Sequence, residues 1–101
     1  MSGRAIRPTI ERSVYRGAPH IIWARDADRA ILVDAQDERS WMLDGIEAAI
    51  WDWLTMGYQY ERIVGFMSLI LKISEDEAGA TLQDTLRRWC HAGLVQRLGD
   101  A

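Results

Sequence analysis

Apolar residues recur in three short runs over the first half of the chain, and polar turn residues separate these runs. The runs lie near residues 20–25, 29–34 and 39–43 and are rich in aliphatic and aromatic side chains. Asp26-Ala27-Asp28 and Gln36-Asp37-Glu38 fill the intervals with residue types that turns prefer. Because the connections are so short, we expect the three strands to pair as an antiparallel meander.

The hydrophobic period then changes from about 2 to about 3.6 residues, which predicts three amphipathic helices near residues 45–55, 60–71 and 75–92. The expected core positions are Ile46, Ala49, Ile50, Trp53 and Leu54, then Ile63, Phe66, Met67, Ile70 and Leu71, then Ala78, Leu82, Thr85, Leu86 and Trp89. Trp51 lies off the first of these stripes, so a half-exposed packing role and a partner contact are both open for it.

Capping residues mark the beginnings of two of these helices. Asp44, with Glu47 three residues later, fits a capping box for the first helix. Ser74 and Glu77 fit the same box for the third helix. These signals place helix starts directly after the third strand and after residue 74.

Three strands, three helices and a final short strand at residues 94–98 predict an α+β, winged helix-turn-helix-like domain over residues 20–98. Residues 1–19 are rich in Pro, Gly and polar residues, and we expect a flexible N-terminal tail there. Within this tail, Ser13–Arg16 could add a short strand.

Composition is that of an ordinary folded protein. The chain has 101 residues, of which 49% are hydrophobic and 27% charged, so we expect one domain with a modest core. The formal net charge of -3 provides no overall attraction for nucleic acid. Cys90 is the only cysteine, which excludes an internal disulfide and fits a cytoplasmic setting. We find neither a signal peptide nor a window of about 20 apolar residues, so no membrane partner is expected.

Reactive residue types do not form a catalytic or metal-binding pattern. Cys90 and His91 are adjacent, and neighbouring side chains on a helix point about 100° apart. No set of His, Cys, Asp and Glu has metal-ligand spacing, and no Gly-rich phosphate loop is present. We therefore expect no catalytic residues, no metal and no cofactor.

Several short motifs follow one another in a distinctive order. They are Leu32-Val33-Asp34, Trp41-Met42-Leu43-Asp44-Gly45, Ala49-Ile50-Trp51, Ile63, Leu82, Leu86 and Gly93-Leu94-Val95. In order and spacing, over about residues 20–98, they resemble the PqqD-like family, whose name comes from protein D of pyrroloquinoline quinone biosynthesis. Members are peptide-recognition domains of pathways that modify ribosomally made peptides. Asp44 stands where the family usually has Asn, and the Thr or Ser common before the second helix is absent.

The resemblance implies a binding site. In the family, the substrate's leader peptide adds as a further strand to the edge of the third strand and lies in a cleft against the third helix. Carried over by position, the implied peptide-binding residues are Arg39, Ser40, Trp41, Met42 and Leu43 on the strand and Thr81, Leu82, Thr85, Arg88 and Trp89 on the helix. Trp41 is expected either to line this groove or to pack in the core.

The resulting expectation is a non-catalytic peptide chaperone, not an enzyme. It would bind the leader of a precursor peptide and present it to a modifying enzyme, such as a radical SAM or a cyclising enzyme. Because an open edge strand permits pairing between copies, we expect a monomer or a weak homodimer.

Two other functions fit the same layout. One is a winged-helix DNA-binding transcriptional regulator that uses the third helix for recognition. That helix carries Glu75, Asp76, Glu77 and Asp84 against Arg87 and Arg88. It therefore lacks the basic face that phosphate contacts need, and no nucleic-acid partner is expected. The other is a subunit or scaffold that uses the same cleft for another protein.

Overall fold

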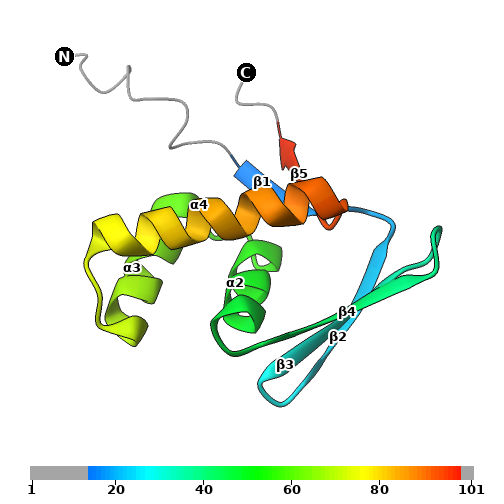
Figure 1. Ribbon diagram of the computed structural model, residues 1–101, viewed down its shortest axis with the longest axis horizontal. Coiled ribbons are helices and arrows are strands. Elements are labelled where there is room, and N and C mark those ends of the chain that lie inside the picture. Colours follow the sequence, from blue (N-terminus) through cyan, green and yellow to red (C-terminus); the bar gives the residue numbers. More distant parts are fainter. Residues whose placement is uncertain (1–13, 99–101) are drawn as a thin grey trace.

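The computed structural model describes residues 14–98, and these form five strands and three helices. In chain order they are β1 Val14–Gly17, β2 Ile21–Asp26, β3 Arg29–Asp34, β4 Arg39–Asp44, α2 Gly45–Thr55, α3 Tyr60–Leu71, α4 Glu75–Ala92 and β5 Val95–Leu98. Figure 1 shows the sheet of β2, β3 and β4 on one side of α2, with α3 on the other side. The predicted α+β architecture is confirmed, with each expected element end within one residue of the observed one.

The strands β2, β3 and β4 form the predicted antiparallel meander, in which β3 is central. In this register Leu32 lies between Trp23 of β2 and Trp41 of β4. Ala30 and Leu32 are buried, whereas Ile31 between them is exposed. Because buried and exposed residues alternate along β3, one face of the sheet packs on the helices and the other face points outward.

A second sheet joins the two ends of the described chain. β1 and β5 pair antiparallel, with Gly17 opposite Val95. The prediction of a flexible tail over residues 1–19 is therefore wrong for residues 14–17, while the short strand considered at Ser13–Arg16 is present as β1. The partner strand comes from the far end of the sequence, so local composition did not reveal it. Residues 1–13 lie outside the described range.

Capping is as predicted for α4 and differs for α2. The Ser74 hydroxyl accepts from the Glu77 backbone N–H at 3.0 Å, and Glu77 Oε1 accepts from the Ser74 N–H at 3.3 Å. Asp44 is the N-cap residue of α2, but its side chain makes no capping bond. Glu47 instead pairs with Arg88 of α4, so a contact between helices replaces the predicted capping box.

The core is centred on Trp51 of α2. Its ring makes edge-to-face contacts with Trp23, at a centroid distance of 6.0 Å, and with Trp89, at 5.8 Å. Trp51 is fully buried, so both of the roles left open for it are wrong. The reason is β1, which packs on this face of α2: a Cβ atom added to Gly17 would lie 3.2 Å from Trp51 Cη2. Among the described atoms, the buried indole N–H of Trp51 has no hydrogen-bond partner.

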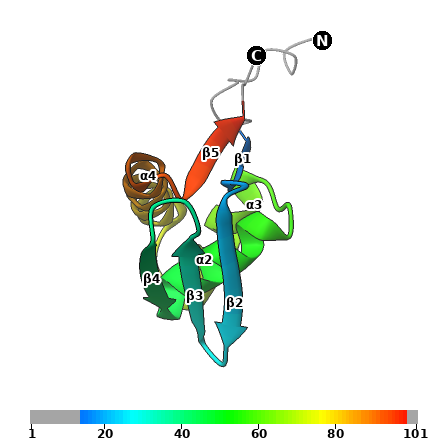
Figure 2. The ribbon, with the colours of Figure 1, turned by 90° about the vertical axis from the view of Figure 1, so that its right-hand side faces the viewer.

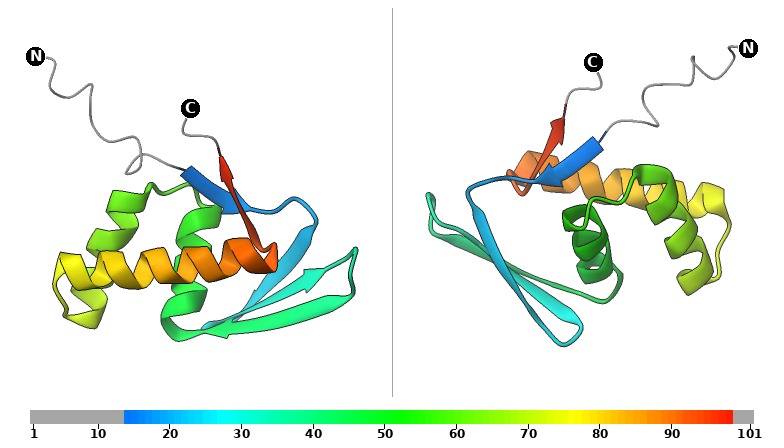
Figure 3. Two further views of the ribbon diagram at one scale, coloured as in Figure 1. Left: turned by 45° about the horizontal axis from the view of Figure 1, so that its top comes forward. Right: turned by 180° about the vertical axis from the view of Figure 1, so that it is seen from behind.

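The predicted stripes match α4 best. Its five predicted core residues are all buried, and α4 lies across α2 and α3 in both views of Figure 3. In α3, Ile63 and Met67 are buried, but the predicted core residues Ile70 and Leu71 are exposed. In α2, the predicted positions Ile46, Ala49 and Trp53 are only half-buried. Helical periodicity predicts an apolar face, and burial additionally requires a neighbouring element over that face.

Candidate functional site

The open edge of β4 is the feature that the sequence predicts as a binding surface. Among the described strands, β4 pairs with β3 alone. In an antiparallel sheet, alternate residues direct their N–H and C=O groups toward one neighbour, so half of β4 directs these groups away from β3. Figure 2 shows β4 at the edge of the sheet nearest α4. Such an edge can accept an extended peptide as an additional strand.

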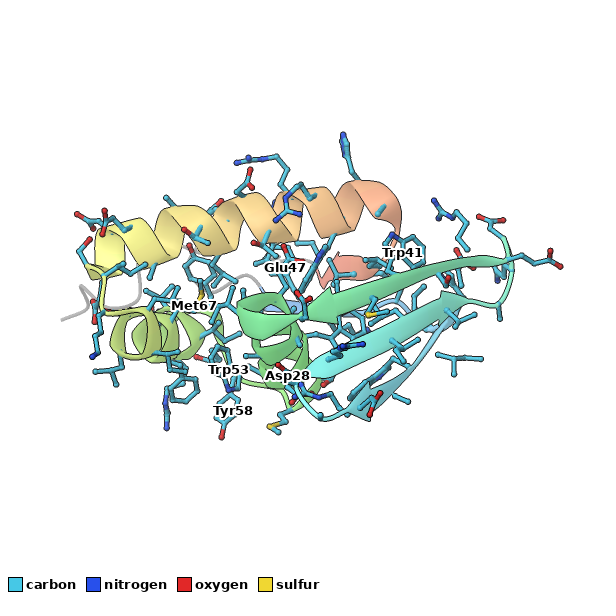
Figure 4. The ribbon with its side chains drawn as sticks, turned by 60° about the horizontal axis from the view of Figure 1, so that its bottom comes forward. Asp28, Trp41, Glu47, Trp53, Tyr58 and Met67 are labelled. Atoms are coloured by element: carbon cyan, nitrogen blue, oxygen red, sulfur yellow. The ribbon has the colours of Figure 1, made fainter. Side chains whose placement is uncertain are left out.

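The side chains of β4 alternate between the two faces of the sheet. Leu43 is buried, and Trp41 is half-buried on the same inward face. In Figure 4, Trp41 projects from β4 into the space between this strand and the C-terminal half of α4. Ser40 and Met42 are exposed on the outward face. A peptide added to β4 would therefore contact Trp41 on one side and continue the row of Ser40 and Met42 on the other.

Arg39 anchors the first residue of β4. Its Nη2 donates to Asp34 Oδ2 at 3.4 Å and to the backbone carbonyl of Ala92 at 3.1 Å. Its guanidinium carbon lies 4.9 Å from the centre of the Trp41 ring, which is cation–π distance. Arg39 therefore connects the strand edge to the C-terminal end of α4 and covers one face of Trp41.

The carboxylate that holds Arg39 is buried. Asp34 Oδ1 accepts from the backbone N–H groups of Gln36, at 2.9 Å, and Asp37, at 3.1 Å. Burial alone would raise the pKa of Asp34, but these two N–H groups, Arg39 and nearby His20 more than offset it, so the pKa lies below its ordinary value. Asp34 is therefore held as an anion that shapes the β3–β4 turn.

Only part of the predicted helix wall is accessible on α4. Thr81 and Arg88 are exposed, whereas Leu82, Thr85 and Trp89 are buried, as is Leu43 of β4. The Thr85 hydroxyl donates to the Thr81 carbonyl at 2.9 Å and accepts from Arg88 at 3.3 Å. These four buried residues belong to the packing behind the site, and direct peptide contact in this conformation is open to Arg39, Ser40, Trp41, Met42, Thr81 and Arg88.

Arg88 is held in an ion-pair cluster. Its Nη2 lies 3.2 Å from Glu47 Oε2 of α2, and its Nε lies 3.2 Å from Asp84 Oδ2 one turn earlier on α4. The hydrogen bond to Glu47, followed by that to Asp84, raises the pKa of Arg88 above its ordinary value. Figure 4 shows Glu47 at the beginning of α2, facing α4. The cationic charge of Arg88 is therefore largely compensated before any ligand arrives.

Three cavities lie away from this edge. They have volumes of about 380, 330 and 290 Å³ and are lined around the α2–α3 turn, around the N-terminal half of α4 with α3, and between β1, β2 and α2. None of these three is lined by a residue of β4. The surface at β4 is thus an exposed strand edge with Trp41 beside it, and none of these three cavities adjoins it.

Chemistry-bearing groups are dispersed over the part of the chain that the structure describes. No three His, Cys, Asp or Glu residues within residues 14–98 are grouped to hold a metal ion. Cys90 is exposed, and partial desolvation raises the pKa of its thiol, which disfavours the thiolate. No helix among these residues is both long and apolar enough to cross a membrane.

Sequence reasoning missed three residues of the site: Asp34, Glu47 and Ala92. Asp34 stands at the beginning of the β3–β4 turn, where Asp side chains commonly accept hydrogen bonds from backbone N–H groups. This position in the sequence is the signal from which its role could be predicted. The sequence predicts a capping box for Glu47, and the structure pairs it with Arg88. The role of Ala92 is carried by its backbone carbonyl, for which side-chain identity gives no signal.

Comparison with known proteins gives a likeness of fold. No protein-family model and no curated protein matches the chain. Two solved structures do match. One is TbiB1 in complex with the TbiA(beta) leader peptide, with a TM-score of 0.78 and 21% identity over 83% of this chain and 98% of that chain. The other is lasso peptide synthetase B1 complexed with the leader peptide, with a TM-score of 0.75 and 18% identity over 81% of this chain and 96% of that chain. At these identities the comparison establishes a shared fold, with nearly the full length of each matched chain covered.

Proposed function

We propose that this chain is a non-catalytic, cytoplasmic peptide-recognition protein. It binds the leader segment of a ribosomally made precursor peptide as an added strand at the open edge of β4 and presents that precursor to a modifying enzyme. The domain that does this extends over residues 14–98, because β1 and β5 pack on α2 and α4 and complete the core.

The observation that carries the proposal is the unpaired edge of β4 next to α4. Half of its backbone groups are free to pair, and Trp41 offers a partly exposed aromatic surface at the same edge. The two solved structures that share this fold both hold a leader peptide, which favours a peptide over other ligands.

The expected affinity follows from the size of such a contact. A segment of a few residues makes several main-chain hydrogen bonds and buries a few side chains against Trp41 and α4. After ordering costs, this leaves about -7 to -10 kcal/mol, which corresponds to roughly micromolar to sub-micromolar binding. Arg88 contributes little net charge attraction, because Glu47 and Asp84 already compensate it.

DNA recognition through α4 is disfavoured by the same ion pairs. Arg87 and Arg88 both pair with Asp84, at 3.7 and 3.2 Å, and the first turn of α4 is acidic. Phosphate contacts need uncompensated cations on the docking face. We expect no tight binding of duplex DNA at physiological salt. A sequence-selective gel shift at nanomolar protein concentration would instead favour DNA binding over peptide binding.

A titration followed by amide chemical shifts tests the proposal. The ¹⁵N-labelled chain is titrated with the TbiA(beta) leader peptide and, in parallel, with the leader of its cognate precursor peptide. Shifts should concentrate at residues 39–43 and on the exposed face of residues 81–89. Shifts confined to α2 and residues 57–60 would refute the site even if a peptide bound.

Matched variants sharpen the titration. Trp41→Ala removes the exposed aromatic surface at the edge and should weaken binding. Leu69→Ala, at an exposed position of α3 away from β4, should leave the affinity unchanged. Equal effects of the two substitutions would indicate that binding does not involve the β4 edge.

A further inference from the structure

The outward face of the β2–β4 sheet carries an apolar patch that no described element covers. The register aligns Ile22 with Val33 and aligns Ala24 with Ile31 and Met42. These five residues, here called the outward patch, belong to three neighbouring strands. Ile22, Ile31, Val33 and Met42 are 63%, 39%, 40% and 59% exposed. In Figure 2 the sheet lies in front, and the helices lie behind it.

Charged residues border the outward patch at both ends. Beyond Ala24, Ile31 and Met42, the next paired residues on this face are Asp26, Arg29 and Asp44. Their formal charges sum to -1. At the other end, the β3–β4 turn carries exposed Asp37 and Glu38. Arg29 lies between the two aspartates of the first row, and Arg39 lies 3.9 Å from Asp37 at the other end, so each border keeps a small net negative charge. A partner with an apolar centre and some basic side chains at its border would complement this face.

The outward face of the sheet is too small to form a stable interface without an additional surface. Three strands about 4.8 Å apart and six residues long at about 3.4 Å per residue cover roughly 14 by 20 Å, or about 290 Å². This is well below the roughly 800 Å² that each partner of a stable complex contributes. A peptide strand added to β4 would widen the same face, because its outward side chains would lie next to Ser40 and Met42.

We propose that the outward patch, extended by the bound leader strand, docks the modifying enzyme that acts on the precursor. This inference rests on the proposed function. The enzyme would contact an apolar centre supplied by β2, β3 and β4, would place basic side chains against Asp26 and Asp44, and would recognise the loaded protein better than the empty one. Presentation of the precursor then needs no contact with α3 or with the inward face.

The experiment measures two affinities for each variant. The first is for the leader peptide, and the second is for the modifying enzyme that acts on the same precursor, with and without saturating leader. Ile31→Arg and Val33→Arg place a charge on β3 within the outward patch, next to Met42 and Ser40 of β4, and the leader affinity of each variant shows whether the β4 edge is disturbed. Leu69→Arg places a charge on the exposed face of α3 as the matched control. Circular dichroism establishes that each variant is folded.

We expect leader to raise the affinity of the wild-type chain for the enzyme at least about tenfold. We expect Ile31→Arg and Val33→Arg to lower the affinity for the enzyme at least about tenfold, with leader affinity within about twofold of wild type. Asp26→Lys should slow association with the enzyme, less so at high salt. Leu69→Arg should change neither affinity.

Two results would overturn the inference about the outward patch, and a third would contradict the proposed function. Unchanged enzyme affinity in both Ile31→Arg and Val33→Arg would exclude the outward patch while leader binding persists. A wild-type dimer in sedimentation that Ile31→Arg dissociates would make a second copy the occupant. If the wild-type chain did not bind leader peptide at all, that result would instead contradict the proposed function.

Discussion

Arg39 in the first position of β4 donates a hydrogen bond to the backbone carbonyl of Ala92, the last residue of α4, at 3.1 Å. The last carbonyls of a helix lack partners within the helix and carry partial negative charge, so a cation is favourable there. The bond joins the open strand edge to the helix that would flank a bound peptide. The separation between the two elements is therefore fixed at this end before any ligand binds.

Acid stability should depend on Asp34. Its pKa lies below the ordinary value of 3.8, so the ionised side chain stabilises the fold above that pH, and this contribution is lost as the pH falls through the lower folded-state pKa. Asp34→Asn should therefore be less stable than wild type at neutral pH, with a gap that narrows below pH 3.8. Urea unfolding at a series of pH values measures this, and a gap that stays constant would show that the carboxylate is not responsible.

Truncation of Leu86 should create a cavity in the core. Leu86 on α4 is buried, and Leu86→Ala should lower the free energy of unfolding by about 2–5 kcal/mol. Leu69→Ala on the exposed face of α3 should stay within about 0.5 kcal/mol of wild type. Thermal or denaturant unfolding gives both values. Similar values for the two variants would mean that the burial of α4 is misassigned.

A larger side chain at Gly17 should weaken the packing of β1 on α2. An added Cβ would lie 3.2 Å from Trp51 Cη2, so Gly17→Val should force β1 away from α2 and cost about 1–3 kcal/mol of stability. Gly65 lies within α3 with open space around its Cβ position, and Gly65→Ala should stabilise by up to about 1 kcal/mol. Opposite signs in denaturant unfolding would support this packing, and a neutral Gly17→Val would contradict it.

Hydrogen exchange should distinguish the two edge strands of the sheet. If a leader peptide adds to β4, alternate amides within Arg39–Asp44 should gain protection, because only every second residue directs its N–H to that edge. β2 is the other edge of the sheet and lies away from α4, so its amides serve as the internal control. Protection that appears in β2 instead of β4 would relocate the binding site.

The Arg88–Glu47 ion pair should be weak. Its side chains are 53% and 35% exposed, so water screens the attraction. A double-mutant cycle with Arg88→Met and Glu47→Gln should give a coupling energy of about 0.2–1 kcal/mol that decreases with salt. A salt-independent coupling well above this range would indicate that the pair is a main determinant of the α2–α4 arrangement.

Local signals explain why the element bounds could be predicted so closely. The alternation along β3 and the box of Ser74 and Glu77 depend on neighbours within a few residues, and both appear in the structure as expected. The likeness of fold to leader-bound proteins likewise follows the motif order that the sequence displays. The resemblance predicts β4 as an edge strand, and the observed order of strands agrees with it.

The sequence by itself determined the elements, their order and the meander, because period, turn residues and caps act over short distances. Tertiary structure decided which side chains are accessible. Trp51 is buried because β1 packs on α2, whereas Ile70 and Leu71 are exposed although the periodicity of α3 predicts them in the core. Arg39 bonds to Asp34, which is 5 positions away in the sequence, and to Ala92, which is 53 positions away. Only the folded chain brings Arg39 and Ala92 together. Burial and long-range pairing depend on what packs opposite a residue, and periodicity within one element carries no information about that neighbour.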